Sequence, residues 1–376
     1  MMKKIYVLYR LIPAFVFSLM LFVPFVANLF CSNEELMDNR PLKDKPTQLD
    51  LDFSKNFEAY YNDTFAGRKK LVSKYIKLQQ KLKIDTGQYF YGSHGWMFYD
   101  SIRVNNGNTM VDYYGEVRFS DEELHEMAEG INRVADLYAS YGAKYVIAVI
   151  PNKERIYSEF MPQRMQKARV SEKSRMDVAI EYLKKNTRAG WVNMTESIMS
   201  GKEQFPQALY FKKDTHWTHL GGYLGFYALA QELNRMGYPL PLKPLNRTMV
   251  REKGKQHVDM HPEALETEYL VDYLPEVTPK CQLEKGEKYV SLCYAPHAPI
   301  SQKVLVLGDS FAAGFMPFLS KGFTETVNAP AGNKKLSYYK NLMQKYRPQL
   351  VVDELIERYF PRFINYNRVF SGHYDD

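Results

Sequence analysis

The stretch KVLVLGDSF, residues 303–311, decides the fold, because it runs an apolar strand directly into a tight turn. The run VLVL predicts a buried strand, and Gly308 permits the sharp turn that follows it. In open α/β sheets, ligands bind beyond the carboxyl ends of the strands. Ser310 is therefore expected at that edge of a sheet, where it opens a helix.

Ser310 has two possible roles at such a position. As a nucleophile it would expose its hydroxyl, and its backbone N–H would be free to face a developing oxyanion. As a helix N-cap it would only satisfy the backbone, a role in which serine is common. The turn alone does not separate these roles.

Helices and strands alternate along the chain on both sides of this stretch. The segment before it predicts, in order, a helix over 120–140, a strand over 143–151, a helix over 172–186, a strand over 190–194 and a helix over 219–236. The segment after it predicts a strand over 323–328, a helix over 333–346 and a strand over 349–355. This alternation predicts an α/β fold with a mostly parallel sheet flanked by helices.

Three other segments complete the expected organisation. Residues 57–84 have apolar residues at helical spacing and predict one long helix, and residues 89–100 predict a hairpin that turns at Gly92–Gly95. Residues 237–300 break the alternation, with many prolines and short β-like runs. They predict either an inserted β-rich segment or a long excursion around the core.

The N-terminus has a different character. The segment LIPAFVFSLMLFVPFVANLF (11–30) carries no charge, and Lys3, Lys4 and Arg10 precede it. About 20 apolar residues can cross a bilayer, and a basic flank stays in the cytoplasm. We expect 1–31 to be a cytoplasmic tip and transmembrane signal anchor, 32–52 a linker, and 53–376 the catalytic domain. A cleaved signal peptide is the alternative.

This anchor implies a single-pass protein of a bacterial inner or cytoplasmic membrane, with its domain in the periplasm or outside. In that compartment Cys281 and Cys293, which bracket QLEKGEKYVSL, could form a disulfide, or they could stay unpaired. The net charge of +7 comes with no long basic run interleaved with aromatic residues, so nothing indicates nucleic-acid binding. A basic face could favour an anionic polysaccharide.

A second motif, FKKDTHWTHL (211–220), places Asp214 two positions before His216. In an extended segment, two such side chains point to the same side. Asp214 can then hold one imidazole nitrogen while the other takes the proton of Ser310. The alternative is metal ligation by His216, His219 and Asp214. Zinc needs further ligands at a recognisable spacing, and His257 and His261 lie in the irregular segment, so we expect no metal site.

Together the two motifs resemble those of the SGNH (GDSL) hydrolase superfamily. They are more closely similar to the DHHW group, which includes the periplasmic alginate O-acetyltransferase subunits. The match is DTHW (214–217) followed by GDSF (308–311), in the circularly permuted order of the acetyltransferase branch. Further segments resemble that branch: NDTFAGRKKL (62–71), GSHGWMFY (92–99) and YRPQLVVDELIERYF (346–360).

Several other residues are candidates for the site. An oxyanion needs more than one donor, so Ser310 N–H after Gly308 could be joined by Asn333, the counterpart of the asparagine that SGNH enzymes supply. Asn333 could equally cap the helix over 333–346. Lys153 and Arg155 follow a strand, where loops that contact substrate are expected. Trp217 either packs in the core or lines the substrate groove.

Near the C-terminus, Glu357 and Arg358 could form an internal salt bridge. That pairing would give both residues a structural role instead of a place in the site.

The resemblance implies an extracytoplasmic O-acetyltransferase that passes an acetyl group through a serine acyl-enzyme to a hydroxyl of a polysaccharide. It also implies no bound cofactor, because a membrane-bound O-acyltransferase partner would supply the acetyl group. An acetyl esterase would use the same Ser310, His216 and Asp214 with water as acceptor. A protein that binds glycans without turnover is the third possibility.

Overall fold

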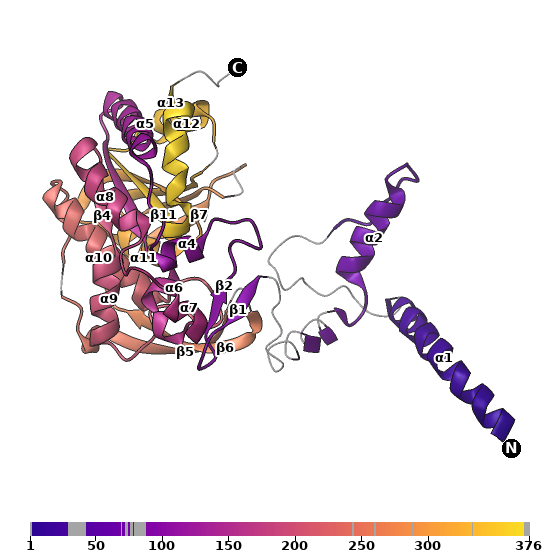
Figure 1. Cartoon of the computed structure of the whole chain (residues 1–376). Coiled ribbons are helices and arrows are strands. Elements are labelled where there is room, and N and C mark those ends of the chain that lie inside the picture. The colour runs from indigo at the N-terminus through magenta and orange to yellow at the C-terminus, as the bar shows by residue number, and fades with distance from the viewer. Residues whose placement is uncertain are drawn as a thin grey trace. The chain divides into compact units, whose positions relative to one another are not determined.

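The computed structural model describes residues 2–28, 43–68, 70–71, 74–75, 78, 88–242, 244–258, 261–286, 289–332 and 334–371. Contacts within the chain divide it into two units, Met1–Thr86 and Gly87–Asp376. The first unit is helical, and the second contains the large sheet (Figure 1). Asn333 and most of the expected linker over 32–52 lie outside the described residues.

The first unit contains α1 (Met2–Asn28) and α2 (Phe53–Thr64). A helix does form where the sequence predicted a membrane anchor. Within the described ranges, however, no helix combines enough length with enough apolar character to cross a bilayer. The predicted transmembrane segment over 11–30 is therefore not supported.

The single long helix expected over 57–84 is also wrong. Helix α2 begins earlier, at Phe53, and ends at Thr64, because Phe65 adopts an extended conformation with ψ 139°. Gly67 then takes a positive φ of 78°, which a helix does not allow.

The second unit is built on a seven-stranded sheet. Its strands lie in the order β4 (Gly190–Asn193), β3 (Lys144–Ile150), β11 (Leu350–Ile356), β9 (Ile300–Gly308), β10 (Phe323–Pro330), β8 (Ser291–Tyr294) and β7 (Lys280–Leu283). The first five strands are parallel to one another. Strand β8 then pairs antiparallel with β10, and β7 pairs antiparallel with β8. The carboxyl ends of β3, β11 and β9 therefore lie side by side.

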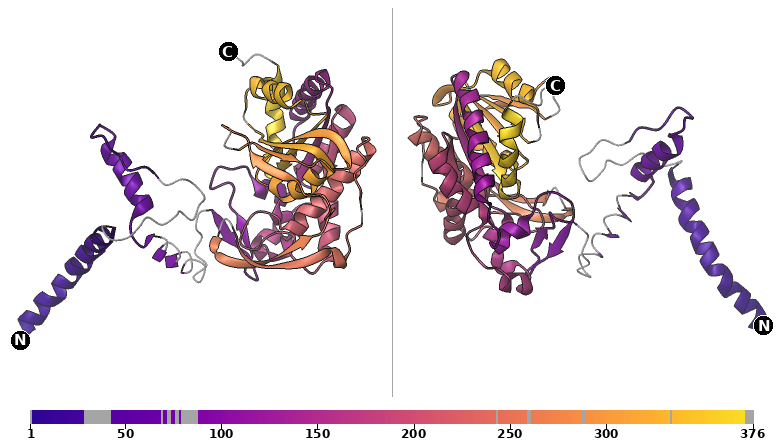
Figure 2. Two further views of the ribbon diagram at one scale, coloured as in Figure 1. Left: turned by 180° about the vertical axis from the view of Figure 1, so that it is seen from behind. Right: turned by 45° about the horizontal axis from the view of Figure 1, so that its top comes forward.

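Helices cover both faces of this sheet, as Figures 1 and 2 show. Val146 and Ala148 of β3 pack on the face covered by α9 (Thr195–Gln204), α10 (His219–Arg235) and α11 (Ala312–Gly322). Ile147 and Val149 pack on the other face, covered by α5 (Asp121–Ser140), α8 (Arg175–Asn186), α12 (Leu336–Tyr346) and α13 (Tyr366–Phe370). Burial on both faces explains why the runs YVIAVI in β3 and VLVL in β9 are apolar. The predicted α/β fold with a mostly parallel sheet is confirmed.

Several short elements complete the second unit. They are β1 (Tyr89–Tyr91), β2 (Met97–Tyr99), α4 (Thr109–Tyr114), α6 (Lys153–Ile156), α7 (Gln163–Lys167) and the 3-10 helices η1 (Ser158–Phe160), η2 (Arg247–Met249) and η3 (Glu357–Asn365). Strands β1 and β2 pair as the expected hairpin. Helix α12 begins at Leu336, later than expected, because Lys335 is still extended.

The segment 237–300 divides into two β structures. Strands β5 (Val250–Val258) and β6 (His261–Val271) form a separate long hairpin, which runs along the lower edge of the unit in Figure 1. Strands β7 and β8 extend the main sheet, and a disulfide joins Cys281 of β7 to Cys293 of β8.

Helices α10 and α11 pack closely because glycines lie at their contact. A Cβ added to Gly222 of α10 would overlap with the carbonyl of Gly314 in α11. A Cβ on Gly314 would in turn overlap with the indole of Trp217. This contact brings the segment before α10 next to the turn before α11.

We expect Gly222→Ala to lower the free energy of unfolding by about 1–3 kcal/mol, because an added methyl group must push two packed helices apart. Thermal unfolding followed by circular dichroism should show a fall in Tm of several degrees. The control is Gln231→Ala on the exposed side of α10, which should change Tm very little. A Gly222→Ala protein that melts with the wild type would contradict the close contact.

Candidate active site

Asp214, His216 and Ser310 form a continuous chain of hydrogen bonds beyond the end of β9. His216 Nδ1 lies 2.7 Å from Asp214 Oδ1, and His216 Nε2 lies 2.8 Å from Ser310 Oγ. The Asp214 carboxylate is buried, whereas the contact between His216 and Ser310 is exposed. Because Asp214 can only accept at Nδ1, the lone pair of Nε2 is left to accept the Ser310 hydroxyl proton.

Lys153 holds the loop that carries Asp214 through hydrogen bonds to its backbone. The Lys153 ammonium donates to the carbonyls of Met97, Lys212 and Asp214 at 2.6, 2.9 and 2.9 Å. Burial lowers the pKa of Lys153 to about 7, although three carbonyl acceptors match the three N–H groups of the charged form. The expectation that Lys153 contacts substrate is wrong, since its side chain is directed into the protein.

The turn that carries Ser310 is held by two carboxyl groups. Asp309 accepts hydrogen bonds from the backbone N–H of Phe311 at 2.8 Å and of Ile356 at 2.9 Å. Its own N–H donates to Glu354 Oε2 at 3.0 Å. Burial, and then the charge of Asp309, raise the pKa of Glu354 well above its usual value, which favours the neutral acid.

Glycine is required at position 308 because atoms of Ala312 and Glu354 lie close to its backbone. A Cβ at this position would lie 2.7 Å from the Ala312 Cβ and 2.8 Å from Glu354 Oε2. Neither Asp309 nor Glu354 was predicted from the sequence to support the site. Their signal was the unusual presence of acids within and directly after buried strands.

Trp217 packs beneath the turn and does not line a groove. Its indole is buried, and Nε1 donates to the Phe311 carbonyl at 3.0 Å. Ser310 does not serve as a helix cap, because α11 begins only at Ala312 with Phe311 as the preceding residue. The Ser310 hydroxyl is directed to His216 instead.

The Ser310 backbone N–H donates no hydrogen bond within the described residues and is free for a ligand. The loop after β10 approaches the same turn, where Ala331 N–H donates to the Gly308 carbonyl at 3.1 Å. The proposed second donor, Asn333, belongs to this loop but lies outside the described residues.

A buried polar network lies behind the site, at the ends of β3 and β11. Arg155 pairs with Glu357 at 2.7 Å and also with Asp177. The expected salt bridge between Glu357 and Arg358 is therefore wrong: η3 directs the two side chains to different neighbours. The Arg358 guanidinium instead lies over the rings of Tyr99, Phe311 and Tyr359.

This arrangement agrees with the comparison to known families. Residues 90–357, more than half of the chain, match the model of the SGNH hydrolase-like domain of acetyltransferase AlgX. The chain belongs to the AlgX family. The resemblance found in the sequence, to the DHHW and alginate O-acetyltransferase group, is thereby confirmed.

Solved structures add support for the fold alone. Bacillus cereus PatB1 with a sulfonyl adduct is 13% identical, with a TM-score of 0.52 over 73% of this chain and 96% of that chain. A second PatB1 structure is 14% identical, with a TM-score of 0.51 over 74% and 99% of the two chains. Pseudomonas aeruginosa AlgX is 14% identical over 78% of this chain and 69% of that chain, with a TM-score of 0.48, which is too low to support the fold. A search of curated proteins found no match.

His219, the other histidine of the motif, makes contacts within this AlgX-family fold and not with the triad. Its Nδ1 accepts the Val271 backbone N–H at 3.2 Å, and its ring packs edge-on against Phe318. Burial lowers the pKa of His219 to about 4, so the ring is neutral at physiological pH. Within the described residues, no three His, Cys, Asp or Glu side chains cluster as a metal site would require.

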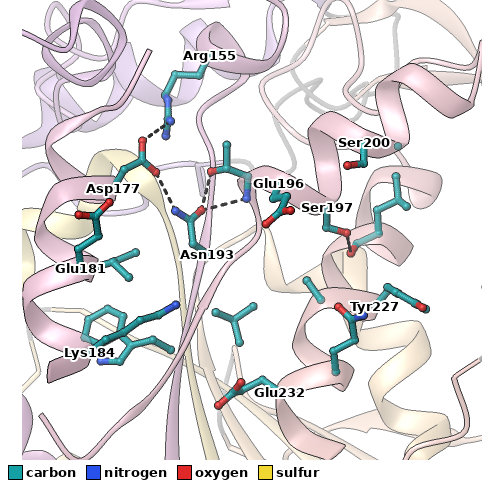
Figure 3. A pocket seen from close by; sticks show the side chains of 18 of the residues that line it. Arg155, Asp177, Glu181, Lys184, Asn193, Glu196, Ser197, Ser200, Tyr227 and Glu232 are labelled. Atoms are coloured by element: carbon teal, nitrogen blue, oxygen red, sulfur yellow. Dashed lines mark hydrogen bonds and ion pairs between the residues drawn. The ribbon is translucent and has the colours of Figure 1, made fainter. Parts of the chain in front are cut away.

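A separate groove lies away from Ser310. It has a volume of about 850 Å³ and lies between α8, β4, α9 and α10 (Figure 3). Neither Asp214, His216 nor Ser310 lines it. Three ion pairs use six of its charged side chains: Arg155–Asp177, Lys173–Glu181 and Arg235–Glu232. Because these side chains pair with one another, their charges are not available to bind a charged ligand.

The depressed pKa of His219 predicts a pH dependence of stability. Between about pH 6.5 and 4, the unfolded chain binds the proton that the folded protein excludes. The free energy of unfolding should therefore fall as the pH falls through this window, by at most about 3 kcal/mol, and this contribution should stay constant below it.

The measurement is urea unfolding at several pH values for the wild type, His219→Gln and His125→Gln. His219→Gln should flatten the profile between pH 6.5 and 4, whereas the exposed His125 should not matter. Equal slopes in the wild type and His219→Gln would contradict the neutral, buried ring.

Proposed function

We propose that this chain is an O-acetyltransferase that acts outside the cytoplasm on a hydroxyl group of a polysaccharide, through an acyl-enzyme on Ser310. The observation that carries the proposal is the hydrogen-bond chain from Asp214 through His216 to Ser310. Such a chain makes a serine nucleophilic at neutral pH, because the imidazole can remove its proton as it attacks.

The reaction proceeds in two balanced steps. Ser310 Oγ attacks the acetyl carbonyl of the donor, and His216 Nε2 takes the hydroxyl proton. The leaving group departs with that proton, and acetyl-Ser310 remains. An acceptor hydroxyl then attacks the acetyl carbon, gives its proton to His216, and releases Ser310 Oγ, which regains a proton from His216. Asp214 stabilises the imidazolium in both steps.

Negative charge develops on the carbonyl oxygen in each step. The free Ser310 N–H is in place to donate to it, because it belongs to the attacking residue and has no other partner within the described residues. A second donor is needed, and we propose Asn333 for this role on the family resemblance.

The polysaccharide acceptor and the donor route rest on the family. The AlgX family is defined by an acetyltransferase, and acetyl donors made in the cytoplasm do not cross the membrane unaided. We therefore propose a membrane-bound O-acyltransferase as the partner that supplies the acetyl group. The Cys281–Cys293 disulfide supports an extracytoplasmic location, since disulfides persist in oxidising compartments.

A second candidate is an acetyl esterase. It is favoured by one observation, the exposure of the contact between His216 and Ser310, because water can reach an exposed acyl-enzyme. Transfer and hydrolysis share the first step and differ only in the acceptor.

The test uses the full chain and 4-nitrophenyl acetate. Intact-mass spectrometry should show a gain of one acetyl group in the wild type and none in Ser310→Ala or His216→Ala. Asp214→Asn should slow acylation by on the order of 10⁴-fold, because it no longer holds the required tautomer of His216. Equal labelling of the wild type and Ser310→Ala would contradict the proposal.

The acceptor is tested by chasing the acetylated protein with oligosaccharides. Faster loss of the label with an oligosaccharide, together with acetylated product, supports transfer. Loss at the same rate in buffer alone would identify an esterase.

A further inference from the structure

We infer that Arg358 forms an anion-binding subsite next to Ser310, which takes an oxyanion group, a carboxylate or a phosphate, carried by the substrate. This inference rests on the proposed function, because it assigns the subsite to the substrate of the same acyl transfer.

The guanidinium is buried without a partner. Arg358 is only 6% exposed, yet within the described residues its guanidinium donates no hydrogen bond and forms no ion pair. Its Nε is fully buried and unsatisfied. Its backbone N–H donates to Asn152 Oδ1 at 3.3 Å. A buried charge without a partner is unfavourable, so this guanidinium is suited to pair with an anion.

Three other arginines of the second unit, Arg155, which is buried, and Arg362 and Arg175, which are partly buried, each pair with a carboxylate, although Arg155 and Arg362 also have an Nε without a partner. Arg155 pairs with Glu357 and Asp177, Arg362 pairs with Asp353, and Arg175 pairs with Asp112. Arg358 lacks the carboxylate that each of these has. Its three aromatic neighbours offer cation–π attraction from their faces but accept no N–H hydrogen bond in the ring plane.

The position of Arg358 links it to the reacting groups. It follows β11, the strand next to β9, so it emerges at the same sheet edge as Ser310. Its guanidinium carbon lies 5.7 Å from the centre of the Phe311 ring, and the same ring lies 4.8 Å from the His216 ring. The Phe311 ring therefore lies close to both the positive charge of Arg358 and the proposed base, His216.

The far side of Arg358 is closed by the protein. A Cβ on Gly107 would lie 2.8 Å from the Arg358 carbonyl and 3.2 Å from its Cγ, so this loop packs directly on the side chain. Tyr359 Oη donates to Asn106 Oδ1 at 2.5 Å, and Asn106 Nδ2 donates to Tyr99 Oη at 2.9 Å. These bonds hold two of the rings around the guanidinium in place.

Nearby acids do not neutralise this charge. Asp214 is committed to His216. The Glu154 carboxyl is buried and makes no ion pair with Arg358; burial raises its pKa, and the charges of Lys153 and Arg358 lower it. Glu154 therefore lies between Lys153 and Arg358 and does not pair with Arg358 alone.

A carboxylate or phosphate suits this site, because a guanidinium binds either through two parallel hydrogen bonds. An anion bound there would orient the rest of the substrate toward Ser310. The subsite would thus select acetyl donors or acceptors that carry a negative charge near the reacting group.

The test compares three acetyl esters that differ in one substituent: 3-acetoxybenzoate, 3-acetoxyphenyl phosphate and the uncharged methyl 3-acetoxybenzoate. The wild type should favour at least one anionic ester over the neutral one by about tenfold or more in KM, the order expected for a charge-assisted hydrogen bond. The preferred anion distinguishes a carboxylate from a phosphate. Arg358→Gln should abolish the preference, and Arg358→Lys should keep part of it.

The control is Arg235→Gln, which removes an exposed arginine that lines the separate groove and should leave the preference intact. Equal KM values for all three esters in the wild type, or the same preference in Arg358→Gln, would overturn the inference. If Arg358→Gln loses its native circular dichroism spectrum, Arg358→Lys decides instead, through a weakened but retained preference.

A binding measurement separates this inference from the proposed function. Calorimetry with Ser310→Ala and the three deacetylated phenols, 3-hydroxybenzoate, 3-hydroxyphenyl phosphate and methyl 3-hydroxybenzoate, needs no turnover. Tighter binding of an anion, lost when Arg358→Gln is added, supports the subsite even if Ser310 is never acylated. Acylation of Ser310 without any anion preference in binding would refute the subsite and leave the acyl transfer standing.

Discussion

The indole of Trp217, packed against the turn that follows Ser310, is the contact on which the rest of the site depends. It joins two segments that are 94 positions apart in the chain through the hydrogen bond from Nε1 to the Phe311 carbonyl. Gly314 and Gly225 leave the space that the ring needs, since a Cβ on either would overlap with it. Because His216 directly precedes Trp217, the packed indole also sets the distance from the imidazole to Ser310. The site is thus held by rigid packing before any substrate binds.

Beneath this contact, the ends of β3 and β11 concentrate buried charge, and most of it is balanced. Arg155 has two carboxylate partners, and Lys153 has three carbonyl acceptors. Burial raises the pKa of Asp112 to about 7 and that of Glu354 well above its usual value, which reduces the negative charge carried inside. The polar groups left facing the reaction are the imidazole of His216, the hydroxyl and N–H of Ser310, and the guanidinium of Arg358.

The parts of the site that could be predicted from the sequence are those with a local pattern. Asp214 and His216 are two positions apart, and Ser310 follows an apolar strand and a glycine, so their roles could be proposed without knowing the fold. The role of Lys153 could not be predicted, because it depends on the 211–214 loop folding back over the end of β3. The links from Asp309 to Glu354 and Ile356 require β11 to lie beside β9, and strand order has no local signature. The unpaired state of Arg358 is likewise set by tertiary contacts.

The central claim is that Asp214 holds His216 ready to take the Ser310 proton, and one-dimensional proton NMR of the protein tests it most directly. A proton held between His216 Nδ1 and a buried carboxylate 2.7 Å away should resonate far downfield of the backbone amides. The account predicts this resonance in the wild type and in Ser310→Ala, and its loss in Asp214→Ala and His216→Ala. Its absence from both the wild type and Ser310→Ala, or its persistence in His216→Ala, would contradict the account.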